Sequence, residues 1–298
     1  MDASNLNNEE KDQEVRWTLA CHCRIKMSFR RPCRIWLGKV IRDILSIELR
    51  RRCPYTSCRK CSPERKEKCP YHYLFASDPP PLLFAIPPPW DILRGLIHES
   101  TNPWKNNGRI LSLEFTLFGK EMFPTIISAL VAAGKNKLRY GIGFDIREIV
   151  DHTNNLVFDG SDYNTPSTFN PWEVRPIRHR NIYYIQYTPH ELPLPVSLKT
   201  LISKIRDRLI RYANAFSNGF VVPCPQISAK LDDYTVAKIH LRLQRRKEFF
   251  NASVGVLSYT IEKISFPTSK MLALAPYIGG GKNISFGFGF AKIEENPY

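Results

Sequence analysis

The chain has 298 residues, enough for two domains of ordinary size, and its apolar content of 43% is that of a globular protein. Lys and Arg number 43 against 28 Asp and Glu, a formal net charge of +15. Such a field attracts polyanions, of which nucleic acid is the commonest, and the clustering of the charges favours this over an uncommitted basic surface. No run of about 18 apolar residues is present, which excludes a membrane-spanning helix.

The N-terminus, residues 1–14, is polar and acidic and lacks the apolar core of a secretory signal. We expect it to form a disordered tail and the protein to be cytoplasmic. The eight cysteines would then lie in a reducing compartment, where a disulfide framework is not expected.

Alternating residues over 15–29 predict a β-strand with an apolar face and a basic face. The basic face carries His22, Arg24 and Lys26, which suits either backbone phosphates or a solvated outer surface. Helical spacing follows over 33–49, with Lys39 and Arg42 outside the apolar stripe. We treat Lys26, Lys39 and Arg42 as candidate RNA-binding residues.

Four cysteines follow three consecutive arginines, Arg50, Arg51 and Arg52, which are further candidates for RNA binding. The C-x4-C-x2-C-x7-C spacing can converge on one tetrahedral ion, and we interpret it as a structural zinc site. Free or disulfide-capable thiols and an iron–sulfur cluster are the alternatives. The proposed ligands are Cys53, Cys58, Cys61 and Cys69.

A stretch with six prolines, residues 78–90, predicts a stiff extended linker and a domain boundary. We therefore expect an N-terminal ferredoxin-like part over 15–77 with a cysteine insert at 50–70, a linker over 78–108, and a C-terminal domain over 109–298. Strict alternation predicts a strand at 110–118 that opens this second domain. A helix over 121–134 and a strand over 140–150 follow.

The last third of the chain holds two further candidate regions. Residues 237–250 combine cations with aromatic rings, a composition typical of an RNA-binding patch, and include His240, Arg242, Arg245 and Arg246. The other region is rich in glycine and could surround a phosphate with backbone N–H groups, although a plain hairpin between two strands is the alternative. Its candidate residues are Gly279, Gly280, Gly281, Lys282, Ser285, Gly287 and Gly289.

A strand–helix–strand order with a further strand pair occurs twice, which predicts an α+β fold of two tandem ferredoxin-like βαββαβ domains. With the glycine-rich segment, this order resembles the RAMP superfamily and, within it, the CRISPR repeat-processing endoribonucleases. Residues 281–289 look like the G-K-x-x-x-F-G-x-G loop of that family. Residues 113–119 and 140–143 are similar to its mid-chain pattern, and residues 69–75 match the end of the cysteine insert of one branch.

The resemblance implies cleavage of precursor CRISPR RNA within its repeats without a metal or other cofactor. A general base would deprotonate a ribose 2′-OH, which attacks the adjacent phosphodiester, and an acid would protonate the leaving 5′-oxygen. His22 and His240 are the candidates for these roles, because the pKa of histidine lies near neutrality; Tyr71 and His72 are weaker candidates.

The chain departs from the family where Gly279 replaces the histidine that several relatives carry, and its first helix contains no histidine. The alternative function is therefore a non-catalytic subunit that binds repeat RNA within a CRISPR effector complex. A third hypothesis is a zinc-stapled nucleic-acid module outside this family. The expected partners are CRISPR repeat RNA and effector subunits, with no membrane and no small-molecule substrate.

Overall fold

The structure is a computed structural model of the chain. It describes residues 20–30, 37–53, 61–67, 69–85, 110–135, 143–174, 181–187, 194–218, 221–242, 249–281, 287 and 289–294, with only the backbone described for part of the strands.

The first sheet has five antiparallel strands in the order β2-β3-β1-β4-β5. The strands are β1 (Ala20–Phe29), β2 (Leu82–Ala85), β3 (Ile110–Phe118), β4 (Phe144–Asp151) and β5 (Leu156–Phe158). Helix α1 (Leu37–Arg51) connects β1 to β2, and α5 (Phe123–Lys135) connects β3 to β4. The short α2 (Pro63–Glu67) and α3 (Pro70–Ala76) follow α1, and η2 (Lys120–Met122) precedes α5. This arrangement is a ferredoxin-like βαββαβ domain with β5 added at one edge.

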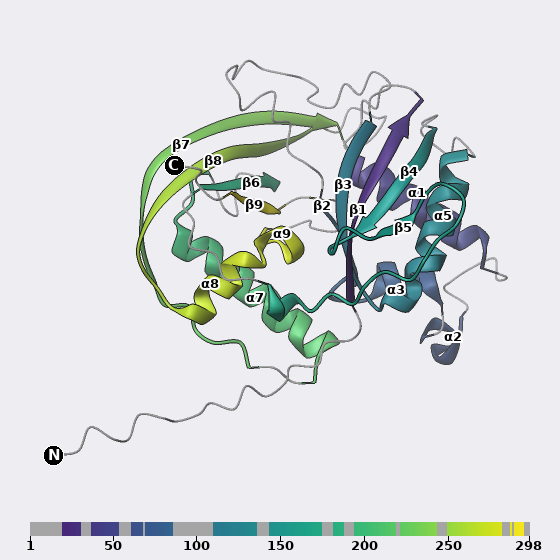
Figure 1. Cartoon of the computed structure of the whole chain (residues 1–298), viewed down its shortest axis with the longest axis horizontal. Helices are drawn as coiled ribbons and strands as arrows, with labels where there is room; N and C mark the ends of the chain where they lie inside the picture. The colour runs from purple at the N-terminus through teal and green to yellow at the C-terminus, as the bar shows by residue number, and fades with distance from the viewer. Residues whose placement is uncertain are drawn as a thin grey trace.

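The second sheet repeats this topology with four strands in the order β7-β8-β6-β9. They are β6 (Asn181–Tyr187), β7 (Ile227–Arg242), β8 (Phe249–Ile264) and β9 (Ala291–Glu294), accompanied by α7 (Leu198–Phe216), α8 (Phe266–Ala273) and α9 (Ala275–Ile278). The short η3 (Pro171–Glu173) precedes β6. Strands β7 and β8 form a long curved hairpin that arches around the three helices (Figure 1). The prediction of two tandem ferredoxin-like domains is confirmed.

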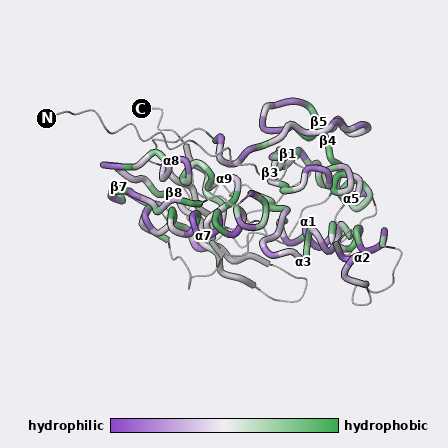
Figure 2. Tube along the Cα trace, turned by 90° about the horizontal axis from the view of Figure 1, so that it is seen from below, coloured by the Kyte–Doolittle hydropathy of each residue, from purple (hydrophilic) through white to green (hydrophobic). Residues whose placement is uncertain are grey.

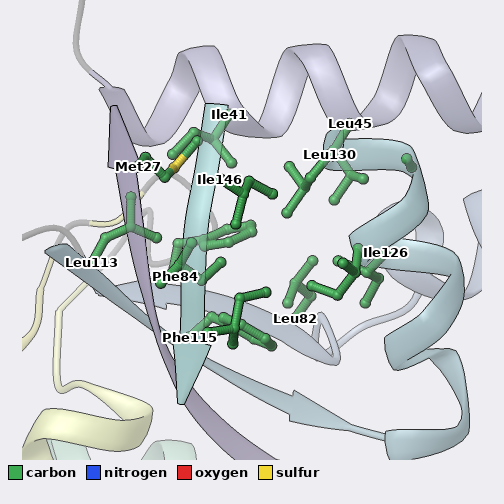
Figure 3. Packing of buried hydrophobic residues seen from close by; sticks show 14 of the residues in the cluster. Met27, Ile41, Leu45, Leu82, Phe84, Leu113, Phe115, Ile126, Leu130 and Ile146 are labelled. Atoms are coloured by element: carbon green, nitrogen blue, oxygen red, sulfur yellow. The ribbon is translucent and has the colours of Figure 1, made fainter. Parts of the chain in front are cut away.

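One face of the first sheet is apolar and packs against α1 and α5. Figure 3 shows Met27, Leu113, Phe115 and Ile146 projecting from the strands toward Ile41, Leu45, Ile126 and Leu130 on these helices, all of them buried. The opposite face of β1 carries His22, Arg24 and Lys26, because successive side chains of a strand alternate between faces. The predicted apolar and basic faces of this strand are confirmed for the residues described.

The second core forms around α7, whose inward stripe of Leu201, Ile205 and Leu209 packs with α8, α9 and β8. Hydrophobic and hydrophilic residues alternate along α7, as expected of an amphipathic helix (Figure 2). The helix begins at a cap in which the Ser197 hydroxyl accepts a hydrogen bond from the Thr200 amide at 3.1 Å. Among the described residues, no helix has both the length and the apolar character needed to cross a bilayer.

The predicted domain boundary within residues 78–108 is wrong. Strand β3 does not open a second domain, because it pairs with β1 from Ala20–Phe118 to Ser28–Ile110 and is the central partner of the first sheet. Of the prolines that suggested a linker, Pro79, Pro80 and Pro81 come directly before β2, an edge strand, so they remove no hydrogen bond from the interior of the sheet. The other three lie outside the described residues. The sheets divide instead between β5 and β6.

Candidate active site at the junction of the two domains

The uncovered face of the first sheet meets the second domain at one end. Ala20 and Phe118 lie on this face and are buried in the second core, so the second domain covers the sheet there. His22 is the next residue of β1 on the same face and is 7% exposed, whereas Arg24, two residues further, is exposed. The face therefore changes from interdomain contact to open surface between His22 and Arg24.

His22 connects the first sheet to α9. Its Nδ1 lies 3.0 Å from the Thr116 hydroxyl, which donates a hydrogen bond to the carbonyl of Tyr277 at 3.1 Å. Because the hydroxyl has one proton, we assign Nδ1–H of His22 as the donor to Thr116, which leaves Nε2 unprotonated. The imidazole also packs edge-on against the Tyr277 ring, with centroids 4.7 Å apart, and lies 5.7 Å from the Phe169 ring.

Burial keeps His22 neutral. Loss of hydration lowers its pKa to about 3, and the charges of His152 and Arg24 act in the same direction. The Glu114 carboxylate, 3.7 Å from Nε2, does not outweigh these effects. A buried imidazole with so low a pKa is suited to holding the two domains together and is a weak proton acceptor.

His152 is a second histidine at this junction. The last residue pair between β1 and β4 is Cys23–Asp151, so the antiparallel register brings His152 next to His22. Both imidazoles contact the same ring, with centroids 5.7 Å (His22) and 5.3 Å (His152) from that of Phe169. Unlike His22, His152 is exposed.

A hydrogen-bonded turn fixes the position of His152. The Asp151 carboxylate accepts hydrogen bonds from the amides of Thr153, Asn155 and Ser167, at 3.0, 3.0 and 2.9 Å, and from the Thr153 hydroxyl at 2.6 Å. Burial alone would raise the pKa of Asp151, but these hydrogen bonds outweigh it and hold that pKa well below its ordinary value. The turn is therefore rigid at neutral pH.

Arg24 is joined to the same turn. Its Nη2 donates to the Asn154 side-chain oxygen at 3.3 Å, and Asn154 adopts the left-handed conformation with φ 65° that asparagine tolerates. The exposed guanidinium of Arg24 is thus hydrogen-bonded to the turn that carries the exposed imidazole of His152. Together they can bind an anionic group and exchange a proton beside it.

The glycine-rich segment is closed by its own backbone. The Gly279 amide donates to the Ala275 carbonyl at 3.1 Å, and the Gly280 and Gly281 amides donate to the Gly289 carbonyl at 2.9 and 3.3 Å. Arg208 on α7 donates to the Gly281 carbonyl from the other side. Each of these three amides therefore already has an acceptor within the fold, and RNA binding by the glycine-rich segment stays a prediction.

Glycine is required where this segment closes. Gly289 has φ 76°, and a Cβ there would lie 2.6 Å from Gly281 Cα; Gly287 has φ 81°. The segment follows directly from α9, whose Tyr277 contacts His22, so it leaves the second domain beside the junction. Lys282 and Ser285 lie outside the described residues.

The predicted RNA-binding residues of α1 do not reach this junction. They belong to the helix that covers the opposite, apolar face of the sheet. Lys39 pairs with Asp43 at 2.9 Å, and Arg42 lies over the Phe75 ring at 5.4 Å.

The arginines at the end of α1 also have partners within the fold. Arg50 lies over the Tyr71 ring at 4.3 Å, and Arg51 and Arg52 lie 3.8 and 3.6 Å from the Glu48 carboxylate. Tyr71 and the adjacent His72 belong to α3, which packs against α1, so neither reaches the junction.

Apart from the cysteines, the remaining predicted site residues are Lys26 and four residues in or just after β7. On the open face, Lys26 pairs with Glu148 at 2.5 Å and is half-buried. His240 and Arg242 belong to β7, but their side chains lie outside the described part of the chain, as do Arg245 and Arg246 entirely.

Three of the four predicted zinc ligands are described. Cys53, Cys61 and Cys69 are half-buried free thiols, and Cys58 lies outside the described residues. Within the described ranges, no three or more His, Cys, Asp or Glu side chains gather as a metal site would require. The four-cysteine site stays a prediction.

The sequence interpretation missed His152, Thr116 and Tyr277. The stretch around His152 (Asp-His-Thr-Asn-Asn) is typical of a turn, and its position beside His22 depends on a strand register that periodicity does not give. A usable signal was present for Thr116: it alternates with Ser112 and Glu114 as the polar residues of a strand that is otherwise apolar.

Several solved structures share this fold. A Cas6 product complex superimposes with a TM-score of 0.54 at 16% identity, covering 93% of this chain and all of that one. The structure of Cas6 from Thermus thermophilus has a TM-score of 0.50 at 13% identity, and the match covers 93% of this chain and 98% of that one. A chain of a partial Cas6-RT-Cas1–Cas2 complex gives 0.52 at 14% identity, covering 93% of this chain and 46% of that one. The protein therefore has the tandem ferredoxin-like fold of the Cas6 structures.

The sequence comparisons define the family. The model AF_1859_N, described as an N-terminal domain, matches residues 17–168, which is more than half of the chain, and AF_1859_C, described as a C-terminal domain, matches residues 182–293. The chain belongs to the AF_1859 family. An Archaeoglobus fulgidus protein described as uncharacterized is 28% identical over 195 residues, which are 61% of this chain and 66% of that protein, just under two thirds of its length.

Proposed function

We propose that this protein is an endoribonuclease that binds precursor CRISPR RNA across the open face of the first sheet and cleaves it within its repeats. The observation that carries the proposal is the junction, where an exposed arginine and two histidines adjoin that face in a chain with the fold of the Cas6 structures. The net charge of +15 supports a polyanionic partner.

The proposed chemistry needs only side chains and the RNA itself. A ribose 2′-oxygen attacks the adjacent phosphorus after losing its proton, and the bond from phosphorus to the 5′-oxygen breaks to leave a 2′,3′-cyclic phosphate. A cation beside the phosphate stabilises the additional negative charge of the transition state, at about 3 kcal/mol for one well-placed donor. A structural zinc on the cysteines, if the four-cysteine prediction holds, would have no part in this reaction.

The experiment is cleavage of an end-labelled CRISPR repeat RNA, from the genome that encodes the chain, in excess EDTA. The proposal expects one major cut and a cyclic-phosphate end on the 5′ fragment. The matched control is the same RNA with a single 2′-deoxyribose at the cut, which should bind equally well and remain intact. Cleavage of the deoxy substrate at the same bond would contradict the proposed chemistry.

A second function is favoured by one observation: His22, one of the two histidines indicated by the sequence, is buried with its pKa lowered to about 3. On this alternative the protein binds repeat RNA without cutting it, as a subunit of a CRISPR effector complex. Tight binding of the ribose substrate with no product over several hours would support the alternative and overturn the nuclease proposal.

The tip of the glycine-rich segment is the second proposed RNA contact. Lys282 and Ser285 belong to it, and we expect Lys282→Ala to weaken repeat-RNA binding and to reduce the slope of log affinity against log salt by about one. An unchanged slope would mean that Lys282 does not contact phosphate.

A further inference from the structure

We propose that His152 and not His22 is the general base for the reaction, and that Arg24 binds the phosphate being attacked. This inference rests on the proposed function and assigns its reacting groups. It starts from the difference in exposure between two adjacent histidines: His152 is open to solvent, whereas His22 is 7% exposed and hydrogen-bonded at Nδ1 to Thr116.

Accessibility favours His152. A general base must come within hydrogen-bond distance of the hydroxyl that it deprotonates. The His22 ring contacts Phe169 and Tyr277, and its hydrogen-bonded edge faces the interior of the junction. The His152 ring contacts Phe169, with centroids 5.3 Å apart, and is otherwise exposed on the open side.

Preorganisation favours the same residue. The turn is fixed by four hydrogen bonds to the Asp151 carboxylate, from Thr153, Asn155 and Ser167. A side chain on a rigid turn loses little conformational freedom when it meets its substrate.

Arg24 supplies the positive charge. Its Nη2 donates the 3.3 Å hydrogen bond to Asn154 on the His152 turn, and its exposed guanidinium has further N–H groups for phosphate oxygens. Lys26, two residues along the same strand, is instead paired with Glu148 at 2.5 Å. Arg24, the proposed phosphate-binding residue, is thus hydrogen-bonded to Asn154, which lies two residues after the proposed base His152.

The proposed step moves one proton to His152 and exchanges one phosphorus–oxygen bond for another. Neutral His152 takes the proton of the 2′-OH, the 2′-oxygen forms a bond to phosphorus, and the bond to the 5′-oxygen breaks. The 5′-oxygen takes a proton from water, and His152 returns its own proton to solvent. Arg24 stays protonated throughout. The products are a 2′,3′-cyclic phosphate and a 5′-hydroxyl.

His22 then has a positioning role. It holds the β1 end of the junction through Thr116 and shares Phe169 with His152. The charged or titratable groups around His152 are His22 and Arg24 from β1, Asp151 in its own turn, Glu114 from β3 beside His22, and Tyr277 from α9 beyond Phe169.

The test measures single-turnover cleavage of the repeat RNA, with EDTA, for wild type, His152→Ala, His152→Gln and Arg24→Ala. Tyr234→Ala is the control, because Tyr234 is 52% exposed on β7, the edge strand of the second sheet, whereas the His152 turn follows β4 of the first sheet. We expect His152→Ala and His152→Gln to lose at least about 100-fold in rate, to bind RNA within about twofold of wild type, and to melt at the wild-type temperature.

Two readouts separate proton transfer from a structural role. The wild-type rate should rise through one titration and level off at higher pH, and this titration should be absent from His152→Ala. Added imidazole should restore part of the His152→Ala rate but should leave Arg24→Ala unchanged. If His152 had only a structural role, its replacement by alanine would change neither the shape of the pH profile nor the response to imidazole.

The possible results separate failure of the inference from failure of the proposed function. If wild type cleaves and His152→Ala cleaves at the same rate, the inference is overturned while the proposed function stands. If His22→Ala, and not His152→Ala, loses the titration while still folded, the roles are reversed and the inference also fails. If wild type binds but never cleaves, both the nuclease proposal and the inference are overturned.

Discussion

His22 makes the stability of the protein depend on pH. Its pKa is 6.5 in an unfolded chain and about 3 in the folded protein, so protonation favours the unfolded state. The stabilising contribution is present above pH 6.5 and is lost as the pH falls toward 3. From pH 7 to pH 5, we expect this residue alone to lower the free energy of unfolding by about 2 kcal/mol.

The measurement is urea unfolding of wild type and His22→Gln at the two pH values. Between pH 7 and pH 5, the free energy of unfolding of wild type should fall by about 2 kcal/mol more than that of His22→Gln. Tyr234→Ala, which changes an exposed and uncharged residue of β7, is the control and should follow wild type. Equal losses in wild type and His22→Gln would mean that His22 is not buried as described.

Gly289 gives a second prediction at the residue scale. A Cβ at this residue would meet Gly281 Cα at 2.6 Å, whereas at Gly160, which also has positive φ (106°), the nearest heavy atom would be 3.9 Å away. Both alanine variants carry a conformational cost, but only Gly289→Ala adds a collision with backbone.

Thermal or urea unfolding should therefore show Gly289→Ala to be less stable than Gly160→Ala by about 1 kcal/mol or more. Equal destabilisation of the two variants would show that the glycine-rich segment opens easily at its base. The amides of Gly280 and Gly281 could then leave Gly289 and turn toward a ligand.

At the scale of elements, the cysteine insert between α1 and α3 is predicted to bind zinc. We expect purified protein to hold about one equivalent of zinc per chain and Cys61→Ser to lose most of it. Cys224→Ser is the control, because Cys224 is an exposed free thiol outside the insert. Metal analysis that finds neither zinc nor iron in wild type would exclude the four-cysteine site.

Local periodicity predicted most elements correctly, since alternation and helical spacing report which side of a segment is buried. The strand at 110–118 shows the limit of this approach. Its pattern identified it as a strand, but its partner, β1, lies some 90 residues earlier, and the prolines near β2 suggested a boundary that the sheet does not have.

The site was predicted only in part, for the same reason. His22 could be found because it alternates with Arg24 and Lys26 on a recognisable strand. His152 becomes its neighbour only through the β1–β4 register. The amides of Gly280 and Gly281 are satisfied by the carbonyl of Gly289, which is eight residues beyond Gly281. Burial of His22 by α9 also depends on how the two domains pack, which no local pattern encodes.

For the whole molecule, the net charge of +15 predicts RNA binding that weakens steeply with salt. Because Arg24 is exposed on the proposed path, Arg24→Ala should reduce the slope of log affinity against log salt by about 0.7 to 1. The control is Lys230→Ala, since Lys230 is exposed on β7. Equal slopes for Arg24→Ala and wild type would remove Arg24 from the interface.

The central claim is that RNA lies on the open face of the first sheet, next to the second domain. The most direct measurement is photocrosslinking of repeat RNA carrying 4-thiouridine near the cut, followed by mass spectrometry of the linked peptides. We predict crosslinks in peptides containing Arg24, Glu114 and His152, which three different elements bring to this face. Crosslinks confined to α1, α3 and α5, on the opposite side of the sheet, with none in those peptides, would contradict the account.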